Sequence, residues 1–278
     1  MSGAAVDQAT ADAFAQSWNH LPPGSVYSRA QFEEWLAPLA RIDAADRRTL
    51  ELGCGGGSLL VHLADWQPAM MVGVDLGDSV QMAERNLAAV PEGRWRILRH
   101  DLVSFRDETP FDLVYCIGVL HHLHEPRAGF TSVLANTAPG GRFHCWVYAH
   151  EGNAVVRALV EPLRRVAHRL PWWLTKYAIA TPLVVPFFLY AKSLRALGWS
   201  ALRVLPLYDY SMWIAARDFS FFRHVAFDQL VTPHTVYLRR GEIEAWLRDP
   251  AIEPESTYLV FRNGNSWKFG GRRRATPG

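Results

Sequence analysis

The chain carries little net charge and few cysteines. Its 278 residues include 29 Lys and Arg against 27 Asp and Glu, a formal net charge of +2. This balance gives no global electrostatic argument for nucleic-acid binding. The three cysteines, Cys54, Cys116 and Cys145, are odd in number and lie in or beside expected strands. That favours free thiols in a reducing compartment over a disulfide framework.

A secretory leader, internal repeats and a long uninterrupted apolar run are also missing. The first 20 residues contain acids and no basic stretch before an apolar run, unlike a secretory signal. The apolar run 178–191 has about 14 residues, whereas a membrane-spanning helix needs about 20, and Pro182 and Pro186 interrupt it. We expect this run not to cross a bilayer. Hydrophobic residues make up 49% of the chain, enough for a sizeable core.

The most informative segment is residues 49–57, Thr-Leu-Glu-Leu-Gly-Cys-Gly-Gly-Gly. A short apolar strand ends in an acid, then Gly53, Gly55 and Gly57 alternate, and helical spacing begins at Ser58. Glycine lets a ligand approach the backbone closely, and strand, glycine loop and helix open the nucleotide-binding half of an α/β domain. A dinucleotide fingerprint would need glycine or alanine where Ser58 stands, which disfavours an NAD-dependent enzyme.

The pattern E-x-G-x-G-x-G, beginning at Glu51, resembles the first motif of the class I S-adenosylmethionine-dependent methyltransferases. Four further segments follow in the order of that family, so the resemblance covers about residues 45–150. Segments 71–76 and 97–102 are short strands that end in Asp75 and Asp101, 111–123 is a strand running into a His-rich turn, and 134–148 reads as helix end, Pro-Gly-Gly turn and strand.

The resemblance implies S-adenosylmethionine as cofactor, with S-adenosylhomocysteine as product. An acid at Asp75, about 20 residues after the glycine loop, is placed to bind ribose hydroxyls, and in the family a residue at Asp101 takes the adenine amino group. Both could instead cap a helix or loop. The expected cofactor contacts are Glu51, Gly53, Cys54, Gly55, Gly57, Asp75, Leu76, Asp101, Leu102 and Ile117.

The predicted fold is α/β, a Rossmann-like and mostly parallel methyltransferase sheet with one antiparallel strand. We expect N-terminal helices over residues 1–44 as a lid and the cofactor-binding core over 45–150. A helical insertion over 151–238 caps the substrate, and 239–270 return as a helix and a β-hairpin, with Asn263-Gly264 as its turn. Residues 271–278 form a tail that we expect to be disordered.

The insertion is rich in aromatic and basic residues. Residues 152–205 contain eight Lys or Arg and one acid, Glu161. Two interpretations remain open: a buried cap with an apolar wall for a greasy substrate, or an interfacial patch in peripheral contact with anionic lipid. Both point to a hydrophobic or lipid-linked acceptor.

A hydroxyl acceptor would need a base, and the turn after the fourth strand offers His121 and His122. Because adjacent residues point differently, we expect one of them, His122, to face the cofactor cleft. His224 and Asp228, in the aromatic end of the insertion, are further candidates. Both pairs could equally be packing residues. A metal site at these histidines is not expected, because no cysteine or carboxylate stands at ligand spacing.

The sequence therefore predicts a cytoplasmic methyltransferase, monomeric or homodimeric, that acts on a hydrophobic small molecule, with O-methylation preferred. The alternatives are a secondary-metabolite N- or C-methyltransferase, another chemistry on the same cofactor such as aminopropyl transfer, and a non-catalytic module whose insertion is a protein or membrane interface.

Overall fold

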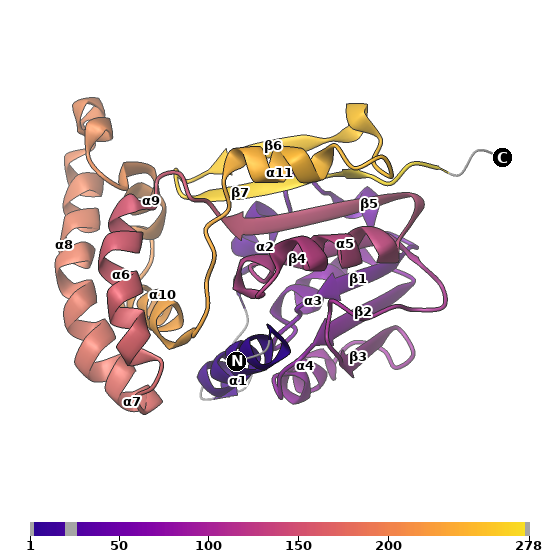
Figure 1. Ribbon diagram of the computed structural model, residues 1–278, viewed down its shortest axis with the longest axis horizontal. Helices are drawn as coiled ribbons and strands as arrows, with labels where there is room; N and C mark the ends of the chain where they lie inside the picture. Colours follow the sequence, from indigo (N-terminus) through magenta and orange to yellow (C-terminus); the bar gives the residue numbers. More distant parts are fainter. Residues whose placement is uncertain (1–2, 20–26, 276–278) are drawn as a thin grey trace.

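A computed structural model describes residues 3–19 and 27–275, and its centre is a seven-stranded sheet in the order β3-β2-β1-β4-β5-β7-β6 (Figure 1). The pairings among β1 to β5 are parallel, and β7 runs antiparallel to both β5 and β6. The predicted sheet, with its antiparallel strand, is therefore confirmed. The strands are β1 Arg48–Leu52, β2 Met70–Asp75, β3 Trp95–Arg99, β4 Phe111–Ile117, β5 Thr137–Tyr148, β6 Tyr258–Arg262 and β7 Ser266–Arg272.

Both faces of this sheet are covered, and successive apolar side chains of a strand point into the two cores in turn. On β4, Val114 and Cys116 face a core completed by α5 and α11, whereas Leu113 and Tyr115 face a core completed by α2 and α3. Period-two alternation sends successive side chains to opposite faces, so a run that is apolar at every position fits a strand covered on both sides. The helices of the core are α1 Gly3–Asn19, α2 Arg29–Leu36, α3 Ser58–Leu63, α4 Val80–Leu87, α5 Pro126–Asn136 and α11 Arg240–Leu247, with 3-10 turns η1 Arg41–Asp43, η2 Ala64–Trp66, η3 Leu120–His122 and η6 Pro254–Ser256.

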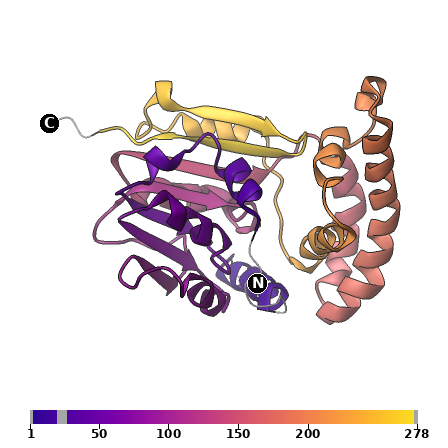
Figure 2. The same ribbon diagram turned by 180° about the vertical axis from the view of Figure 1, so that it is seen from behind.

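The insertion forms a separate helical layer beyond the end of the sheet toward which β5 points (Figures 1 and 2). Helix α10 packs against α6, η4 and α8, and α8 also packs against α9. Two apolar clusters hold these helices together, one around Phe227 and one around Phe222. The elements are α6 Ala154–Ala167, α7 Trp172–Leu174, the π-helix η4 Thr175–Ala180, α8 Thr181–Leu197, the 3-10 turn η5 Ser200–Val204, α9 Tyr208–Ile214 and α10 Phe219–Val231.

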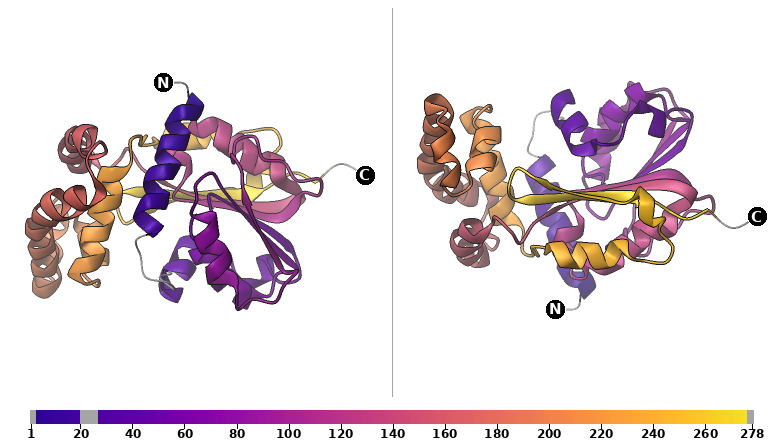
Figure 3. Two further views of the ribbon diagram at one scale, coloured as in Figure 1. Left: turned by 90° about the horizontal axis from the view of Figure 1, so that it is seen from below. Right: turned by 90° about the horizontal axis from the view of Figure 1, so that it is seen from above.

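Helix α1 lies between the sheet and the insertion, as the view from below shows (Figure 3). It packs against α10, and its Asp7 Oδ1 accepts a hydrogen bond from the backbone N–H of His124 at 2.6 Å. A Cβ on Gly77 would come within 3.0 Å of the Ala11 carbonyl oxygen, so the helix backbone passes close to the loop after β2. The N-terminal helix thus covers the edge where the parallel strands end.

A second link ties three parts of the chain to Glu34 of α2. Its Oε1 accepts from the Arg262 guanidinium of β6 at 2.6 Å, and its Oε2 accepts from Trp213 Nε1 of α9 at 2.8 Å. Lys268 Nζ of β7 donates to the Glu34 carbonyl at 2.7 Å. The insertion is therefore fixed to the core by hydrogen bonds as well as by apolar contact.

The expected interruption of the apolar run by proline was wrong. α7, η4 and α8 form one continuous helical stretch of 26 residues, Trp172–Leu197, in which the most apolar 18 consecutive residues have a mean hydropathy of 1.3. Both Pro182 and Pro186 lie inside this stretch. Pro182 follows the π turn η4 closely, and there Thr181 Oγ1 donates to the Lys176 carbonyl at 2.9 Å, a local adjustment that accommodates the missing N–H. Among the described residues, this is the one helix long and apolar enough to cross a membrane by length and composition.

Two smaller expectations also need correction. The Pro-Gly-Gly segment at 139–141 is not a turn before the fifth strand but part of β5, which starts at Thr137 and shifts register opposite β4. The start of the expected tail is ordered, because β7 runs through Arg272 and the Arg273 guanidinium donates to the Thr137 carbonyl at 2.6 Å. Pairing of β7 with β5 and the Arg273 side-chain hydrogen bond hold this segment in place, and side-chain periodicity reveals neither.

Candidate active site

The glycine loop after β1 has a backbone that other residues rarely adopt. Gly53, Gly55 and Gly57 all have positive φ, at +79°, +50° and +72°. A Cβ on Gly53 would lie only 2.4 Å from Cγ2 of Val119, in the loop after β4. Glycine is thus required at this position both for the left-handed backbone and for the close approach of two loops.

One cavity, with a volume of about 520 Å³, begins at this loop and reaches the insertion. Nine of the ten expected cofactor contacts line it: Glu51, Gly53, Cys54, Gly55, Asp75, Leu76, Asp101, Leu102 and Ile117. Gly57 is not part of the cavity wall described. It stands before α3, where a Cβ would come within 3.0 Å of Ala83 on α4, so its smallness serves helix packing.

Glu51 is a buried acid on the cavity wall. Its Oε2 accepts a hydrogen bond from Tyr115 OH at 3.1 Å. Burial raises the pKa of Glu51 well above its usual range, and the Tyr115 hydrogen bond opposes that rise only in part. A cationic ligand group in the cavity would therefore favour the ionised carboxylate.

Asp75, at the end of β2, braces the glycine loop. Its Oδ2 accepts from the Gly55 N–H at 2.9 Å, and its Oδ1 accepts from the Gly77 N–H at 2.9 Å and from Ser79 Oγ at 3.1 Å. Burial raises the pKa of Asp75, and these hydrogen bonds work against the rise. The acid expected to bind ribose therefore also sets the shape of the loop beside it.

Asp101 both faces the cavity and closes a loop, and its expected contact with adenine stays a prediction. It lines the cavity, and its Oδ1 accepts from the backbone N–H of Val103 at 2.9 Å, closing the turn after β3. With Asp75 it places two carboxylates at the ends of neighbouring parallel strands, the edge at which open α/β sheets bind ligands.

The two histidines after β4 have different surroundings. His122 lines the cavity, whereas His121 is fully buried against Tyr148, with ring centroids 4.0 Å apart. The Nδ1 of His122 lies 3.1 Å from the carbonyl oxygen of His234. Burial lowers the pKa of His122 to about 3, so its ring is neutral near pH 7. It can hold a hydrogen bond there, but it takes up a proton poorly.

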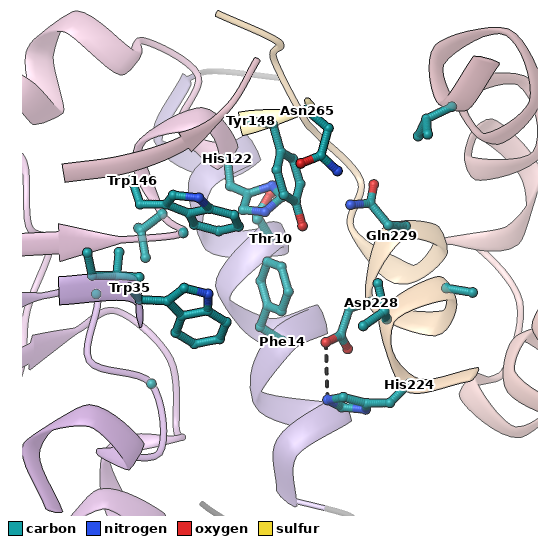
Figure 4. A pocket seen from close by; sticks show the side chains of 18 of the residues that line it. Thr10, Phe14, Trp35, His122, Trp146, Tyr148, His224, Asp228, Gln229 and Asn265 are labelled. Atoms are coloured by element: carbon teal, nitrogen blue, oxygen red, sulfur yellow. Dashed lines mark ion pairs between the residues drawn. The ribbon is translucent and has the colours of Figure 1, made fainter. Parts of the chain in front are cut away.

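The N-terminal segment closes the cavity from another side. Thr10 and Phe14 of α1 line it, and Phe14 meets His122 edge to face at 4.9 Å (Figure 4). Tyr27 also lines the wall; burial raises its pKa, and the negative charges of Asp228 and Glu51 raise it further. Tyr27 is thus within electrostatic reach of both the cofactor motif and the insertion.

The insertion supplies the opposite wall. On α10, His224 Nε2 and Asp228 Oδ2 are 3.2 Å apart, both side chains are 21% exposed, and both line the cavity. In Figure 4 this pair faces Phe14 and Trp35 across the cavity, and Gln229, the residue after Asp228, lies beside it on the same helix. The i, i+4 spacing on a helix is what brings the imidazole to the carboxylate.

Several wall residues were not anticipated. Trp35 of α2 stacks on Trp146 of β5 with ring centroids 5.9 Å apart, and both line the cavity. Tyr148 follows Trp146 at the strand period of two, a signal that could have placed both on one face of β5. Asn153, Tyr237, Arg262 and Asn265 come from distant segments that only the tertiary fold brings here.

The wall suits a cationic adenosyl ligand. A glycine cradle, a buried acid of raised pKa at one end and two carboxylates at the strand ends match its cations and its sugar. No group of three or more His, Cys, Asp or Glu that could hold a metal ion occurs among the described residues.

A family model described as a methyltransferase domain matches residues 27–201, well over half of the chain. The chain belongs to the methyltransferase domain family. This methyltransferase uses S-adenosylmethionine, as that family does. The glycine loop and the two strand-end carboxylates lie within the part of the chain that this family model matches.

The chain is similar in sequence to curated methyltransferases and in fold to solved ones. A ubiquinone biosynthesis O-methyltransferase from Paracidovorax citrulli is 28% identical over 45% of the chain and 51% of its own length. The chain thus spans about half the length of this curated relative. A magnesium protoporphyrin IX methyltransferase from Synechocystis PCC 6803, solved with bound SAH, has a TM-score of 0.58 at 14% identity, covering 98% of this chain and 100% of the other. An O-methyltransferase family protein from Burkholderia thailandensis has a TM-score of 0.55 at 15% identity, covering 90% and 57%.

Proposed function

We propose that this methyltransferase methylates an oxygen of a hydrophobic, lipid-like small molecule held between the sheet and the insertion. The observation that carries the proposal is the single cavity of about 520 Å³ that joins the cofactor motif to the helical layer. This volume lies within the range of small-molecule sites, about 300–1,000 Å³. Donor and acceptor would share one enclosed space.

The far end of the cavity is apolar. Its wall there comes from four helices of the insertion, through Val156, Val160, Leu183, Val184, Phe187, Tyr210, Trp213, Ile214, Phe221 and Phe222. Burying an apolar chain against such a wall contributes about 25 cal/mol for each Å² removed from water. A small polar metabolite would gain nothing from it, which supports a greasy acceptor. Such an acceptor partitions into membranes, and a cytoplasmic enzyme working at a membrane surface is part of the proposal.

Oxygen as the methylated atom is supported by a base in the wall and by the similarity to the ubiquinone biosynthesis O-methyltransferase. When bound, the cofactor supplies an electrophilic methyl group. A hydroxyl acceptor must lose its proton as it reacts, and a positioned imidazole is the usual group to take it. With His224 Nε2–H directed at Asp228, the Nδ1 of His224 is left to accept that proton.

We assign the proton transfer to His224 rather than to His122. The pKa of His122 is about 3 because of burial, so its protonated form is too acidic to hold the proton near pH 7. His224 is partly exposed, and its Nε2 lies 3.2 Å from Asp228 Oδ2, which orients the ring in the cavity wall. Burial raises the pKa of Tyr27, the negative charges of Asp228 and Glu51 both raise it further, and all three residues line the cavity. Tyr27 therefore lies within electrostatic reach of both the His224–Asp228 pair and the glycine-loop end. Tyr27 would help to position the acceptor there.

The test is labelled methyl transfer from S-adenosylmethionine into a whole-cell lipid extract, with the product identified by mass spectrometry. We expect an O-methylated apolar product, and an N- or C-methylated product would overturn the proposal. His224→Gln should lower kcat/KM by about 10²–10⁴-fold with cofactor affinity unchanged. Glu244→Gln, in the surface i, i+4 pair with Arg240, is the matched control. Activity of His224→Gln equal to the control would remove this residue from the mechanism.

A further inference from the structure

The helical stretch Trp172–Leu197 has apolar side chains on two sides, but the protein covers only one. Of the 18 consecutive residues with the highest mean hydropathy in this stretch, 22% are buried inside the protein. The inner side carries Val184 and Phe187, which line the cavity. The outer side carries Trp173, Tyr177, Val185 and Leu189, each between 43% and 59% exposed. We call these four residues the outer face.

The π-helix within the stretch aligns the outer face. A single π turn adds one residue relative to an α-helix, and one residue corresponds to a rotation of about 100°. Counting that extra residue in η4, Thr175–Ala180, the four side chains fall within about 60° of one another around the axis. Without it, Val185 and Leu189 would turn well away from Trp173. The insertion therefore builds one continuous apolar strip, where a water-facing helix would show polar residues.

The outer face lies in a segment of the chain that carries no acidic residue. No Asp or Glu occurs between Glu161 and Asp209. Exposed arginines stand at both ends of the helix, Arg169 before it and Arg195 and Arg203 at and beyond its end. Trp199, between the latter two, is 63% exposed. Aromatic residues suit the headgroup level of a bilayer, and flanking arginines suit anionic headgroups.

Contacts on the inner side fasten the helix to the rest of the insertion, so it is not free to cross a membrane. Phe187 stacks on Tyr210 of α9, and Phe188 meets Phe222 of α10 at 5.0 Å. Lys192 Nζ donates to the carbonyls of Ala215 and Arg217 at 2.9 and 3.0 Å. Crossing a bilayer would break these contacts and expose the cavity wall, whereas lying in the interface keeps them.

We propose that the outer face docks in the interface of an anionic lipid bilayer, with Arg169, Arg195 and Arg203 on the headgroups. This inference rests on the proposed function, because the helix that touches the lipid also forms the cavity wall, so an apolar acceptor passes from bilayer to cavity around one helix. Figure 1 shows α8 as the helix farthest from the sheet, where it can approach a flat surface without obstruction by the core.

The test is co-sedimentation of the full chain with phosphatidylcholine vesicles that contain or lack phosphatidylglycerol. We expect binding to the anionic vesicles that weakens with salt. Each arginine near an anionic surface adds about fivefold to the partition coefficient. Arg169→Gln, Arg195→Gln and Arg203→Gln together should therefore lower it about a hundredfold. Arg85→Gln, Arg240→Gln and Arg248→Gln, exposed on the core, form the matched control and should bind as the unchanged protein does.

A second pair of variants tests the apolar contact. Trp173→Glu with Leu189→Glu should abolish vesicle binding, whereas Ile42→Glu with Val260→Glu, exposed apolar positions on the core, should not. Calorimetry with S-adenosylmethionine, done on every variant, separates the two proposals, because docking can fail while cofactor binding and soluble-substrate turnover persist. The docking proposal would be overturned if the unchanged protein does not bind vesicles, or if each control variant loses as much vesicle binding as its test variant. It would also be overturned if the protein is a dimer that Trp173→Glu with Leu189→Glu dissociates.

Discussion

Two glycines of the cofactor loop allow backbone strain to be separated from loss of the binding site. Gly53 and Gly57 have nearly equal φ, +79° and +72°, but only Gly53 lines the cavity. A left-handed backbone costs a side chain about 1–2 kcal/mol, and the stiffer unfolded chain offsets part of it, so backbone strain at either position should cost about 1 kcal/mol of stability. Gly57→Ala should therefore melt about 2–4 °C lower, and Gly53→Ala should melt lower still because its new Cβ also overlaps Val119.

Their cofactor affinities should differ. In Gly53→Ala the new Cβ would meet three side-chain atoms of Val119 at 2.4, 2.8 and 2.9 Å, well inside the contact distance of about 3.5–4.0 Å. Such overpacking costs about 1–3 kcal/mol, so S-adenosylmethionine should bind about 5- to 150-fold more weakly. In Gly57→Ala the neighbour is Ala83, outside the cavity, and affinity should stay within about threefold.

Isothermal titration calorimetry measures both affinities, and thermal unfolding measures both stabilities. The double variant Gly53→Ala with Val119→Ala should regain part of the affinity, because two of the three overlapping atoms are removed. Equal affinities for Gly53→Ala and Gly57→Ala would refute the placement of the cofactor at Gly53.

Three further predictions follow from buried charges. Burial raises the pKa of Glu51, so this acid should release a proton when the cationic cofactor binds. The affinity for the cofactor should therefore rise with pH, and calorimetric titrations in two buffers of different ionisation enthalpy should detect the released proton. Glu51→Gln should lose both effects. Glu34→Ala leaves the Arg262 guanidinium, whose side chain is 7% exposed, without its carboxylate partner. Urea unfolding should show that the free energy of unfolding falls by about 2–3 kcal/mol. A fall as small as that of the exposed Glu244→Ala, about 0–1 kcal/mol, would contradict this prediction. Burial lowers the pKa of His144 to about 4, so its contribution is complete above the unfolded pKa of about 6.5 and is lost as pH falls toward 4. The stability difference between the unchanged protein and His144→Gln should therefore shrink by about 1.4 kcal/mol per pH unit over that window, and a constant difference would show that His144 is not buried neutral.

The cofactor half of the fold was predictable because its signals are local. Alternating glycines, strand-ending acids and the Asn263-Gly264 turn each act within a few residues, and the structure has them on the expected strands and loops. All three cysteines are free and buried, as predicted. The acid at Asp75 illustrates the limit, because its bonds to Gly55 and Ser79 depend on loop geometry that spacing alone does not give.

The acceptor half was predictable only in outline. Composition indicated a helical, aromatic insertion, but the continuity of the helix through Pro182 depends on a π turn that has no sequence signature. The meeting of Arg262, Trp213 and Glu34 joins segments up to 228 residues apart. Contacts of that kind arise from tertiary packing, which periodicity does not encode.

The aromatic wall provides an optical signal for binding. Trp35, Trp146 and Trp213 face the cavity and contact other rings or the Arg262 guanidinium. An acceptor that enters will displace water from these indoles, and a quinone or porphyrin would quench their emission. Intrinsic fluorescence can therefore screen unlabelled compounds for acceptors before any product is known.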